Sequence, residues 1–156
     1  DTVIVLTSDH GWNLGEKTHW CKAAIWRDTT RVPFMVVAPG VSKAGLRNNQ
    51  PISHVDIYPS LCDFAGIPKP KYLEGRSILP LLKDPSATRD FAFLSYGPQN
   101  TAAQSEQFRY LRYEDGSEEL YDHKKDPHEW INLIGNKNYQ SIRKKMRAQV
   151  LDFQKK

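Results

Sequence analysis

Asp9 and His10 lie side by side directly after a β-branched apolar run at residues 2–7. A carboxylate and an imidazole are both common ligands of divalent metals. Ligands in open α/β sheets bind beyond the carboxyl ends of the strands, which is where this pair falls. An isolated Asp-His-Gly sequence is nevertheless more often a capped loop with its histidine in solvent. The pair is therefore a candidate metal site whose support must come from the residues that follow.

Four further residues follow closely on that pair. Lys22 ends the stretch, and by residue type alone a lysine at this position is a simple surface residue. Trp12, His19 and Trp20 lie between the candidate metal ligands and the lysine. These three rings could wall a substrate pocket, or they could equally well pack the loop on which they lie.

Motifs spread along nearly the whole chain occur in the same order as in a known enzyme family. They are Ser8-Asp-His-Gly-Trp-Asn-Leu-Gly-Glu-Lys-Thr-His-Trp-Cys-Lys22, Thr30-Arg-Val-Pro33, Ala38-Pro-Gly40, Ser53-His-Val-Asp-Ile-Tyr-Pro-Ser-Leu61, Ala65-Gly-Ile-Pro68, Leu73-Glu-Gly-Arg-Ser77, Glu118-Glu-Leu-Tyr-Asp122, Asp126-Pro127, Glu129 and Asn132-Leu133. In content and order they resemble the sulfatase family, and most closely its iduronate-2-sulfatase-like and choline-sulfatase-like branch. Because the match runs through nearly the whole chain, it is specific.

The resemblance implies an α/β fold that is the C-terminal part of an alkaline-phosphatase-like architecture. It also implies that Asp9 and His10 bind a metal, usually calcium, and that Lys22 is the catalytic lysine that grips the substrate's sulfate. A metal and a fixed ammonium can stabilise the negative charge that develops as a sulfate ester is cleaved. Calcium prefers oxygen ligands whereas His10 offers nitrogen, so the identity of the metal stays open.

The resemblance also defines a residue that this sequence lacks. Sulfatases use a cysteine or serine, oxidised to formylglycine, at the head of a Cys/Ser-x-Pro/Ala-x-Arg pattern. Neither Cys21 nor Cys62 heads that pattern, and no serine does. In the family this nucleophile lies N-terminal to the strand at residues 2–7, together with a further aspartate pair for the metal. We therefore expect the chain to be a C-terminal segment that works with the N-terminal part of the same enzyme, and to be inactive alone.

The apolar pattern predicts the elements that would position these residues. Residues 2–7 and 32–38 are continuous apolar runs, which are typical of strands covered on both faces in a parallel sheet. Gly66, followed by Pro68, is expected to end a helix that begins near Asp56. The helices predicted in this part of the chain are residues 23–29, 56–65 and 77–82.

Beyond residue 88 the pattern changes to short segments separated by turns. Residues 91–96, 108–113 and 119–121 predict a small antiparallel sheet. The spacing of the apolar residues near the end of the chain predicts a final helix with one buried stripe. That stripe comprises Tyr139, Ile142, Met146, Val150 and Phe153. We therefore divide the chain into an α/β core portion, residues 1–88, and an antiparallel-sheet subdomain with a terminal helix, residues 89–156.

Composition excludes several other classes of protein. The chain has 156 residues, of which 39% are hydrophobic and 26% charged, and no apolar run long enough to span a bilayer. Its net charge of +4 comes from the final helix, because that region has seven basic residues against the single acid Asp152. The seven are Lys137, Arg143, Lys144, Lys145, Arg147, Lys155 and Lys156. A solvated helix face explains them, so neither nucleic acid nor a membrane is expected as a partner.

Isolated histidines and cysteines have structural interpretations. We expect His54 to cap a turn, and His123 and His128 to be solvated in the turn that follows residue 122. Cys21 and Cys62 are too few for a disulfide scaffold, so free and mostly buried thiols are expected.

Two alternatives to a sulfatase segment stay open. One is a segment of a phosphodiesterase or phosphonate hydrolase of the same superfamily, which binds related anions. The other is a non-catalytic anion-binding module. For a sulfatase, a sulfated small molecule or saccharide is the expected partner, with a leaning towards glycosaminoglycan uronic acids. The resemblance also implies a periplasmic, secreted or lysosomal location.

Overall fold

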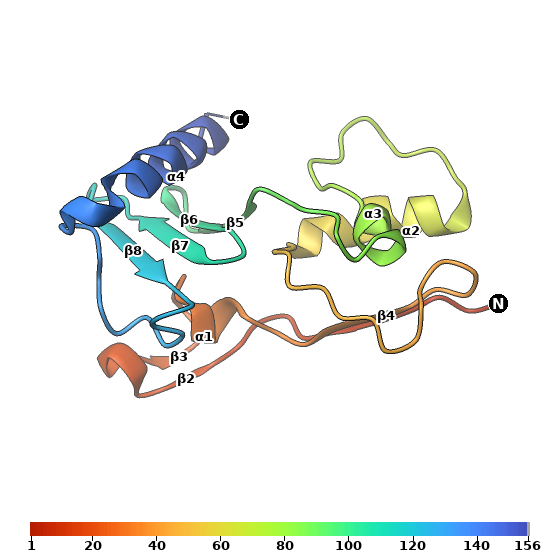
Figure 1. Cartoon of the computed structure of the whole chain (residues 1–156), viewed down its shortest axis with the longest axis horizontal. Helices are drawn as coiled ribbons and strands as arrows, with labels where there is room; N and C mark the ends of the chain where they lie inside the picture. The colour runs from red at the N-terminus through yellow and green to blue at the C-terminus, as the bar shows by residue number, and fades with distance from the viewer. Residues whose placement is uncertain (156) are drawn as a thin grey trace. The chain divides into compact units, whose positions relative to one another are not determined.

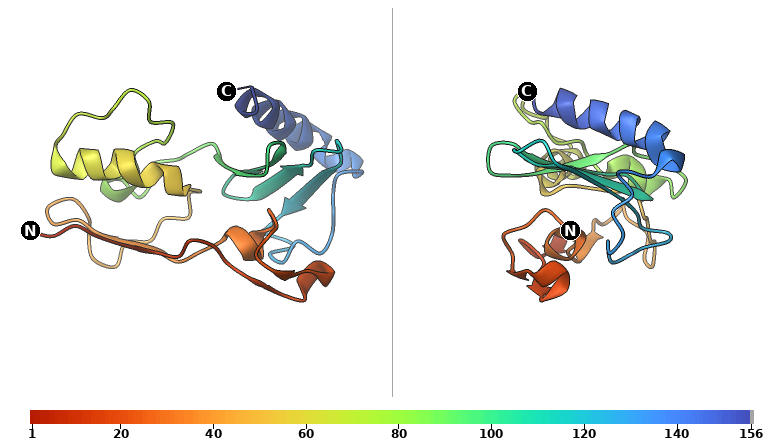
Figure 2. Two further views of the ribbon diagram at one scale, coloured as in Figure 1. Left: turned by 180° about the vertical axis from the view of Figure 1, so that it is seen from behind. Right: turned by 90° about the vertical axis from the view of Figure 1, so that its left-hand side faces the viewer.

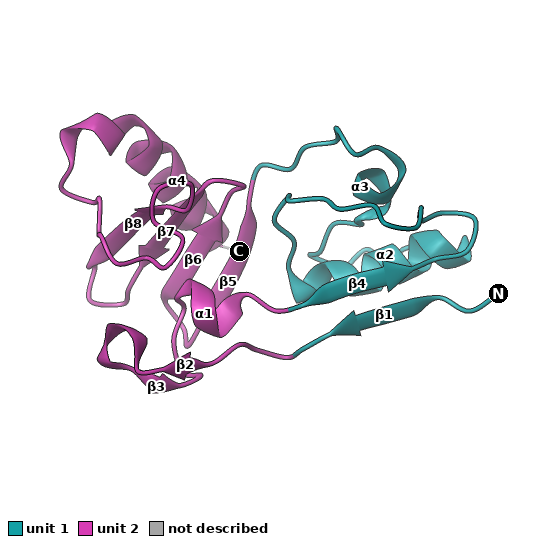
Figure 3. Cartoon of the chain, turned by 60° about the horizontal axis from the view of Figure 1, so that its bottom comes forward, with its two compact units in different colours: residues 1–8, 33–90 teal, residues 9–32, 91–156 magenta. Residues whose placement is uncertain are grey.

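The computed structural model describes residues 1–155, so Lys156 of the predicted basic tail and C-terminal subdomain lies outside the described residues. The chain forms two compact units, each built from two stretches of sequence (Figure 3). Unit 1 comprises residues 1–8 and 33–90, and unit 2 comprises residues 9–32 and 91–156. All candidate site residues therefore belong to unit 2. The predicted division at residues 88 and 89 stays a prediction.

The two apolar runs form a pair of strands in unit 1. Strand β1 (Ile4–Thr7) pairs with β4 (Phe34–Val37) in antiparallel register, with Ile4 opposite Val37. The two strands were expected to belong to a parallel sheet, and this expectation is wrong for the pair that they form. An apolar run indicates burial but does not determine strand direction. Four large side chains of the pair are about half exposed. They are Ile4 (54%), Leu6 (48%), Met35 (57%) and Val37 (53%).

A buried carboxylate, Asp56, joins the helical part of unit 1 to the loops beside it. A short 3-10 turn, η2 (His54–Asp56), continues into α2 (Ile57–Ala65), and α3 (Leu79–Lys83) follows later. The Asp56 carboxylate accepts hydrogen bonds from the backbone N–H groups of Ser53 and Arg76 and pairs with Arg89 at 2.8 Å. Gly66 ends α2 with φ 67°, so the predicted glycine cap is confirmed.

A four-stranded antiparallel sheet forms the centre of unit 2. Its strands, in order, are β5 (Ala92–Tyr96), β6 (Asn100–Gln104), β7 (Phe108–Arg112) and β8 (Glu118–Asp122). Three of them confirm the predicted sheet, whereas β6 was not predicted. Its sequence, Asn-Thr-Ala-Ala-Gln, has few of the β-branched and aromatic residues that favour strands. Ala102 and Ala103 are nonetheless fully buried in the middle of the sheet.

One face of this sheet is covered by the C-terminal helix. A 3-10 turn, η3 (Lys137–Tyr139), leads into α4 (Gln140–Phe153). Met146 and Val150 are fully buried against Tyr110 and Leu120, and Phe153 stacks on Phe93 with ring centroids 4.6 Å apart. The predicted apolar stripe of the last helix is therefore confirmed.

The other face of the sheet is covered by residues 9–32. This segment contains β2 (Asn13–Leu14), the 3-10 turn η1 (Glu16–Thr18), β3 (Trp20–Cys21) and α1 (Arg27–Thr30). Ile25 packs with Ala102, Leu111 and Tyr121. Figures 1 and 2 show α4 on one side of β6–β8 and the segment from β2 to α1 on the other. Helix α1 is shorter than predicted and begins later, since residues 23–26 form a loop.

Within residues 1–155, no helix combines the length and the apolar character that crossing a membrane requires. The two cysteines are free as expected. Cys62 is buried, whereas Cys21 is exposed and the expected burial is wrong for it, because it lies on the short hairpin strand β3.

Candidate functional site

The side chains of Asp9 and His10 face each other. The backbone N–H of His10 donates to Asp9 Oδ1 at 3.0 Å, and His10 Nε2 lies 3.3 Å from Asp9 Oδ2. His10 Nδ1 lies 2.7 Å from the carbonyl oxygen of Gly11, which can only accept, so Nδ1 carries a proton. A protonated ring therefore forms an ion pair with Asp9 through Nε2, whereas a neutral ring leaves the Nε2 lone pair beside the carboxylate oxygen. In the neutral form these two atoms are neighbouring electron-pair donors that suit a bound cation.

This pair is only a partial ligand set. Among the described residues, no group of three or more His, Cys, Asp or Glu side chains is arranged to hold a metal. One oxygen and one nitrogen donor fit a divalent metal, but further ligands would have to come from elsewhere. The donors present are therefore compatible with a metal without defining which one.

The charge of Lys22 acts on the same carboxylate. Partial desolvation by itself would raise the pKa of Asp9. The charges of His10 and Lys22 and the hydrogen bonds from backbone N–H groups outweigh this effect and hold the pKa of Asp9 below its ordinary value. Lys22 is exposed and directly follows Cys21, whose backbone is left-handed with φ 73°. The structure thus brings Asp9 and His10 together, and the Lys22 charge is the smallest of the influences on the pKa of Asp9.

Gly11 joins the metal-ligand candidates to helix α1. Its N–H donates to the carbonyl of Thr29 at 2.8 Å, and the N–H of Trp12 donates to the carbonyl of Asp28 at 2.9 Å. A Cβ atom at position 11 would lie 2.0 Å from the Asp28 carbonyl oxygen, so only glycine allows this approach. Residues 9–12 and 28–29 are consequently held as one frame.

The three aromatic candidates have different surroundings. Trp12 is half exposed, and its ring lies 6.0 Å from that of His10. Trp20 is 65% exposed on the short hairpin. His19 instead packs edge-on against Trp26 at 5.7 Å, and its buried Nε2 has no hydrogen-bond partner among the described residues. Trp12 and Trp20 therefore offer open aromatic faces, whereas His19 packs the loop.

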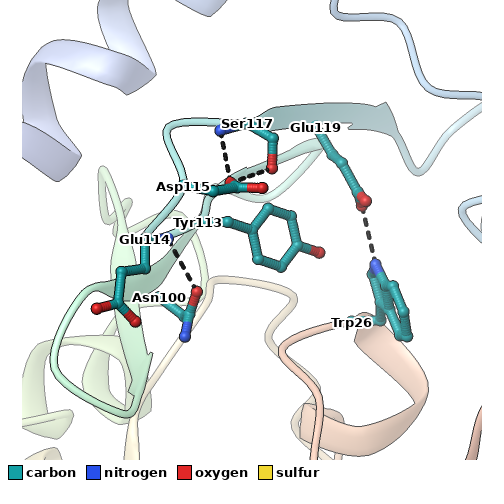
Figure 4. Close-up of a pocket in the computed structure, with 7 residues that line it drawn as sticks. All are labelled: Trp26, Asn100, Tyr113, Glu114, Asp115, Ser117 and Glu119. Atoms are coloured by element: carbon teal, nitrogen blue, oxygen red, sulfur yellow. Dashed lines mark hydrogen bonds between the residues drawn. The ribbon is translucent and has the colours of Figure 1, made fainter.

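A separate pocket of unit 2 has the wrong charge for an anion. It measures about 450 Å³ and lies at the turn between β7 and β8 (Figure 4). Its lining residues are Trp26, Asn100, Tyr113, Glu114, Asp115, Ser117 and Glu119. Three carboxylates would repel a sulfate, so this pocket is not the candidate site.

A buried charge cluster was missed by the sequence reasoning. Glu129 is 1% exposed, and its Oε1 lies 2.8 Å from His123 Nε2 and 3.5 Å from Arg109 Nε. His123 is therefore largely buried and not solvated as expected, because it pairs with this carboxylate. The sequence offered two signals, Glu129 among the family-like motifs and Arg109 in a segment of alternating residues, but neither predicts a pair between residues so far apart in the chain. His54 Nε2 lies 3.1 Å from Thr7 Oγ1, and His128 is exposed.

Known proteins share this sequence and this fold. The model of the family described as N-sulphoglucosamine sulphohydrolase, C-terminal, matches residues 15–156. A protein named sulfatase from Formosa agariphila is 37% identical over 142 residues, which cover 90% of this chain and 28% of the relative.

Solved structures extend the likeness to the fold. BT4656, solved in complex with its substrate D-glucosamine-2-N,6-O-disulfate, has 29% identity and a TM-score of 0.78, over 98% of this chain and 34% of that one. The phosphonate monoester hydrolase of Agrobacterium radiobacter has 28% identity and a TM-score of 0.78, over 97% of this chain and 34% of that one. The chain spans roughly a third or less of the length of these proteins.

Proposed function

The chain belongs to the family described as N-sulphoglucosamine sulphohydrolase, C-terminal, and on that basis we propose that it forms the metal-facing and sulfate-facing part of a sulfuric-ester hydrolase. The observation that carries this proposal is the convergence of His10 Nε2 and Asp9 Oδ2 at 3.3 Å, with the Lys22 charge acting on the same carboxylate. A carboxylate and an imidazole can bind a cation, and a neighbouring ammonium can bind the anion that this cation attracts.

Each residue would have a distinct role in that site. Asp9 and His10 would hold a divalent metal, proposed to be calcium, which when bound would neutralise charge on the sulfate oxygens. Lys22 would bind the remaining sulfate oxygens as a point charge and stabilise the negative charge that builds up on cleavage. The nucleophile, proposed to be a formylglycine, would be supplied by the N-terminal part of the same enzyme.

A sulfated saccharide is the proposed substrate class. Trp12, whose ring lies 6.0 Å from that of His10, and Trp20 are both exposed, and aromatic faces of this kind suit the apolar side of a sugar ring. BT4656 was solved with a sulfated glucosamine, which shows that a protein with this fold binds such a compound. We propose that the two tryptophans contact the sugar while Lys22 contacts the sulfate.

Substitution of Lys22 in the intact protein tests the proposal directly. Lys22→Ala should lower kcat/KM for an aryl sulfate by about 100- to 1,000-fold, which is the usual effect of removing one charge-stabilising donor. Lys43→Ala is the matched control, because Lys43 is also an exposed lysine but belongs to unit 1. Equal activity of the two variants would refute the assignment of Lys22.

The metal role has its own test. Asp9→Asn should weaken calcium binding measured by titration calorimetry in the intact protein, because it removes the charged oxygen donor while preserving shape. Unchanged calcium affinity would show that Asp9 is not a ligand.

A phosphonate or phosphodiester hydrolase is the second candidate function. It is favoured by the likeness to the Agrobacterium radiobacter enzyme, whose identity and TM-score are close to those of BT4656. Parallel assays of the intact protein with an aryl sulfate and an aryl phosphonate monoester separate the two functions. A higher kcat/KM for the phosphonate would replace the sulfatase proposal.

A further inference from the structure

The segment that carries Lys22 is attached to the sheet on its N-terminal side by Lys17. We call residues 15–30 the Lys22 loop. Lys17 Nζ donates to the hydroxyl of Tyr121 at 2.9 Å and lies 4.5 Å from the centre of that ring. The Tyr121 hydroxyl in turn donates to Glu119 at 2.7 Å, which also accepts from the indole N–H of Trp26 at 2.8 Å. Strand β8 therefore bonds to the Lys22 loop at two residues, Lys17 before Lys22 and Trp26 after it.

The same loop is attached on its C-terminal side by buried charges. Glu129 accepts the backbone N–H of Arg27 at 2.9 Å. Arg109 donates to the carbonyl of Ile25 at 2.6 Å and to the Thr30 hydroxyl at 2.8 Å. Both charged side chains are almost fully buried, so these bonds are shielded from water and fixed in direction.

Strained backbone conformations occur in the Lys22 loop and at its anchor Glu129. Among the described residues, positive φ at a non-glycine position occurs only at Lys17 (53°), Thr18 (56°), Cys21 (73°) and Glu129 (60°). Three of the four lie in the Lys22 loop, and the fourth is the residue that anchors it. Such conformations persist only where the surrounding contacts determine them, and they cluster at functional sites. The anchors supply those contacts.

We propose that Tyr121 and Glu129 are positioning residues that hold Lys22 at the sulfate-binding site through the Lys22 loop. The proposal rests on the proposed function of Lys22. Tyr121 fixes the loop before Lys22 through Lys17, and Glu129 fixes it after Lys22 through Arg27. Because Gly11 and Trp12 bond to the carbonyls of Thr29 and Asp28, the second anchor also holds the frame that carries Asp9 and His10.

Tyr121→Phe is the sharpest test because it removes a single hydroxyl. In the intact protein it should lower kcat/KM for an aryl sulfate by about 10- to 100-fold, as small displacements of catalytic groups do. Tyr110→Phe is the matched control. Tyr110 is a buried tyrosine of the neighbouring strand, packed on the α4 side of the sheet, and loss of its hydroxyl should leave kcat/KM unchanged.

A double-mutant cycle separates positioning from general damage to the fold. If Tyr121 acts through Lys22, adding Tyr121→Phe to Lys22→Ala should cause no further loss of kcat/KM. The full loss in both backgrounds would overturn the proposal. No loss in the wild-type background would overturn it as well. If Lys22→Ala itself has no effect, the proposed function fails instead, so the two failures are distinguishable.

Glu129→Gln tests the second anchor. It keeps an oxygen that can accept the Arg27 N–H but removes the charge beside Arg109 and His123. The same non-additivity with Lys22→Ala is expected, together with an increase in KM for the sulfate ester. Circular dichroism identifies a variant that fails to fold, in which case the Tyr121 cycle alone decides. Additive losses in a folded Glu129→Gln protein would contradict the anchor.

Discussion

The two faces of the β5–β8 sheet are covered by different kinds of contact. On the α4 face, Met146 and Val150 pack against Tyr110 and Leu120 in an apolar cluster. On the opposite face, Ile25 packs against a smaller apolar cluster, and buried Arg109 and Glu129 bond to the backbone beside it. Apolar packing is non-directional, whereas hydrogen bonds fix position and angle. The first face therefore chiefly stabilises the unit, whereas the second also orients a loop.

Breaking the buried pair should have the largest effect on stability. Arg109→Met leaves the Glu129 carboxylate buried without its nearest guanidinium, and should reduce the free energy of unfolding by about 3–5 kcal/mol. Urea denaturation of the intact protein measures this change, and Arg31→Met at an exposed arginine is the control. A loss similar to the control would mean that the second face does not depend on its buried charges.

Truncation on the α4 face should come next. Met146→Ala should cost about 2–5 kcal/mol of unfolding free energy, because it leaves a cavity under the helix. Met146→Leu nearly conserves volume and should cost less than about 1.5 kcal/mol. Neither variant should change KM for the sulfate ester under conditions where the protein is folded. A raised KM in folded Met146→Ala would show that packing on the α4 face also affects substrate binding, which contradicts the proposed difference between the two faces.

Acid should weaken the loop face through Glu129. Burial alone would raise the pKa of Glu129, yet the hydrogen bond from His123 and the charge of Arg109 hold it below its ordinary value of 4.5. A lowered pKa contributes stability that is present above the ordinary value and is lost as pH falls through the value in the folded protein. The Tm difference between wild type and Glu129→Gln should therefore shrink as pH falls below the ordinary value of 4.5. A difference that stays constant with pH would exclude this contribution.

The smallest effect is expected at the exposed edge of the α4 face. Arg147 pairs with Glu118 at 2.9 Å, and its side chain is 48% exposed. Arg147→Gln should change the free energy of unfolding by less than about 1 kcal/mol, because solvent screens such a pair and Arg143 also binds Glu118. A calorimetric Tm shift as large as that of Met146→Ala would show that polar contacts stabilise this face too.

Local patterns in the sequence predicted much of the fold. The apolar stripe of α4, the glycine that ends α2 and three of the four sheet strands follow from spacing that neighbouring residues determine. Strand β6 was missed because its alanines have little strand preference by themselves and are buried only by the sheet around them. The antiparallel direction of β1 and β4 was missed because no local pattern records it.

The candidate site was predictable only in part. Asp9, His10 and Lys22 were predicted as site residues because they are close in sequence and match a motif, and their roles stay a proposal. The anchors of their loop were not found, since Tyr121, Arg109 and Glu129 lie far along the chain from the residues they hold. His123 was expected in solvent for the same reason. Contacts over such separations depend on tertiary packing, which spacing along one chain does not encode.

The half-exposed side chains of β1 and β4 have a practical consequence for handling this polypeptide. A two-stranded ribbon is marginal in water, and its open edges can pair with other copies. Expressed without the remainder of a larger protein, the chain would put Ile4, Leu6, Met35 and Val37 into solvent. Purified preparations should therefore oligomerise with rising concentration and bind hydrophobic dyes, and co-expression with a segment that covers the ribbon should keep them monodisperse.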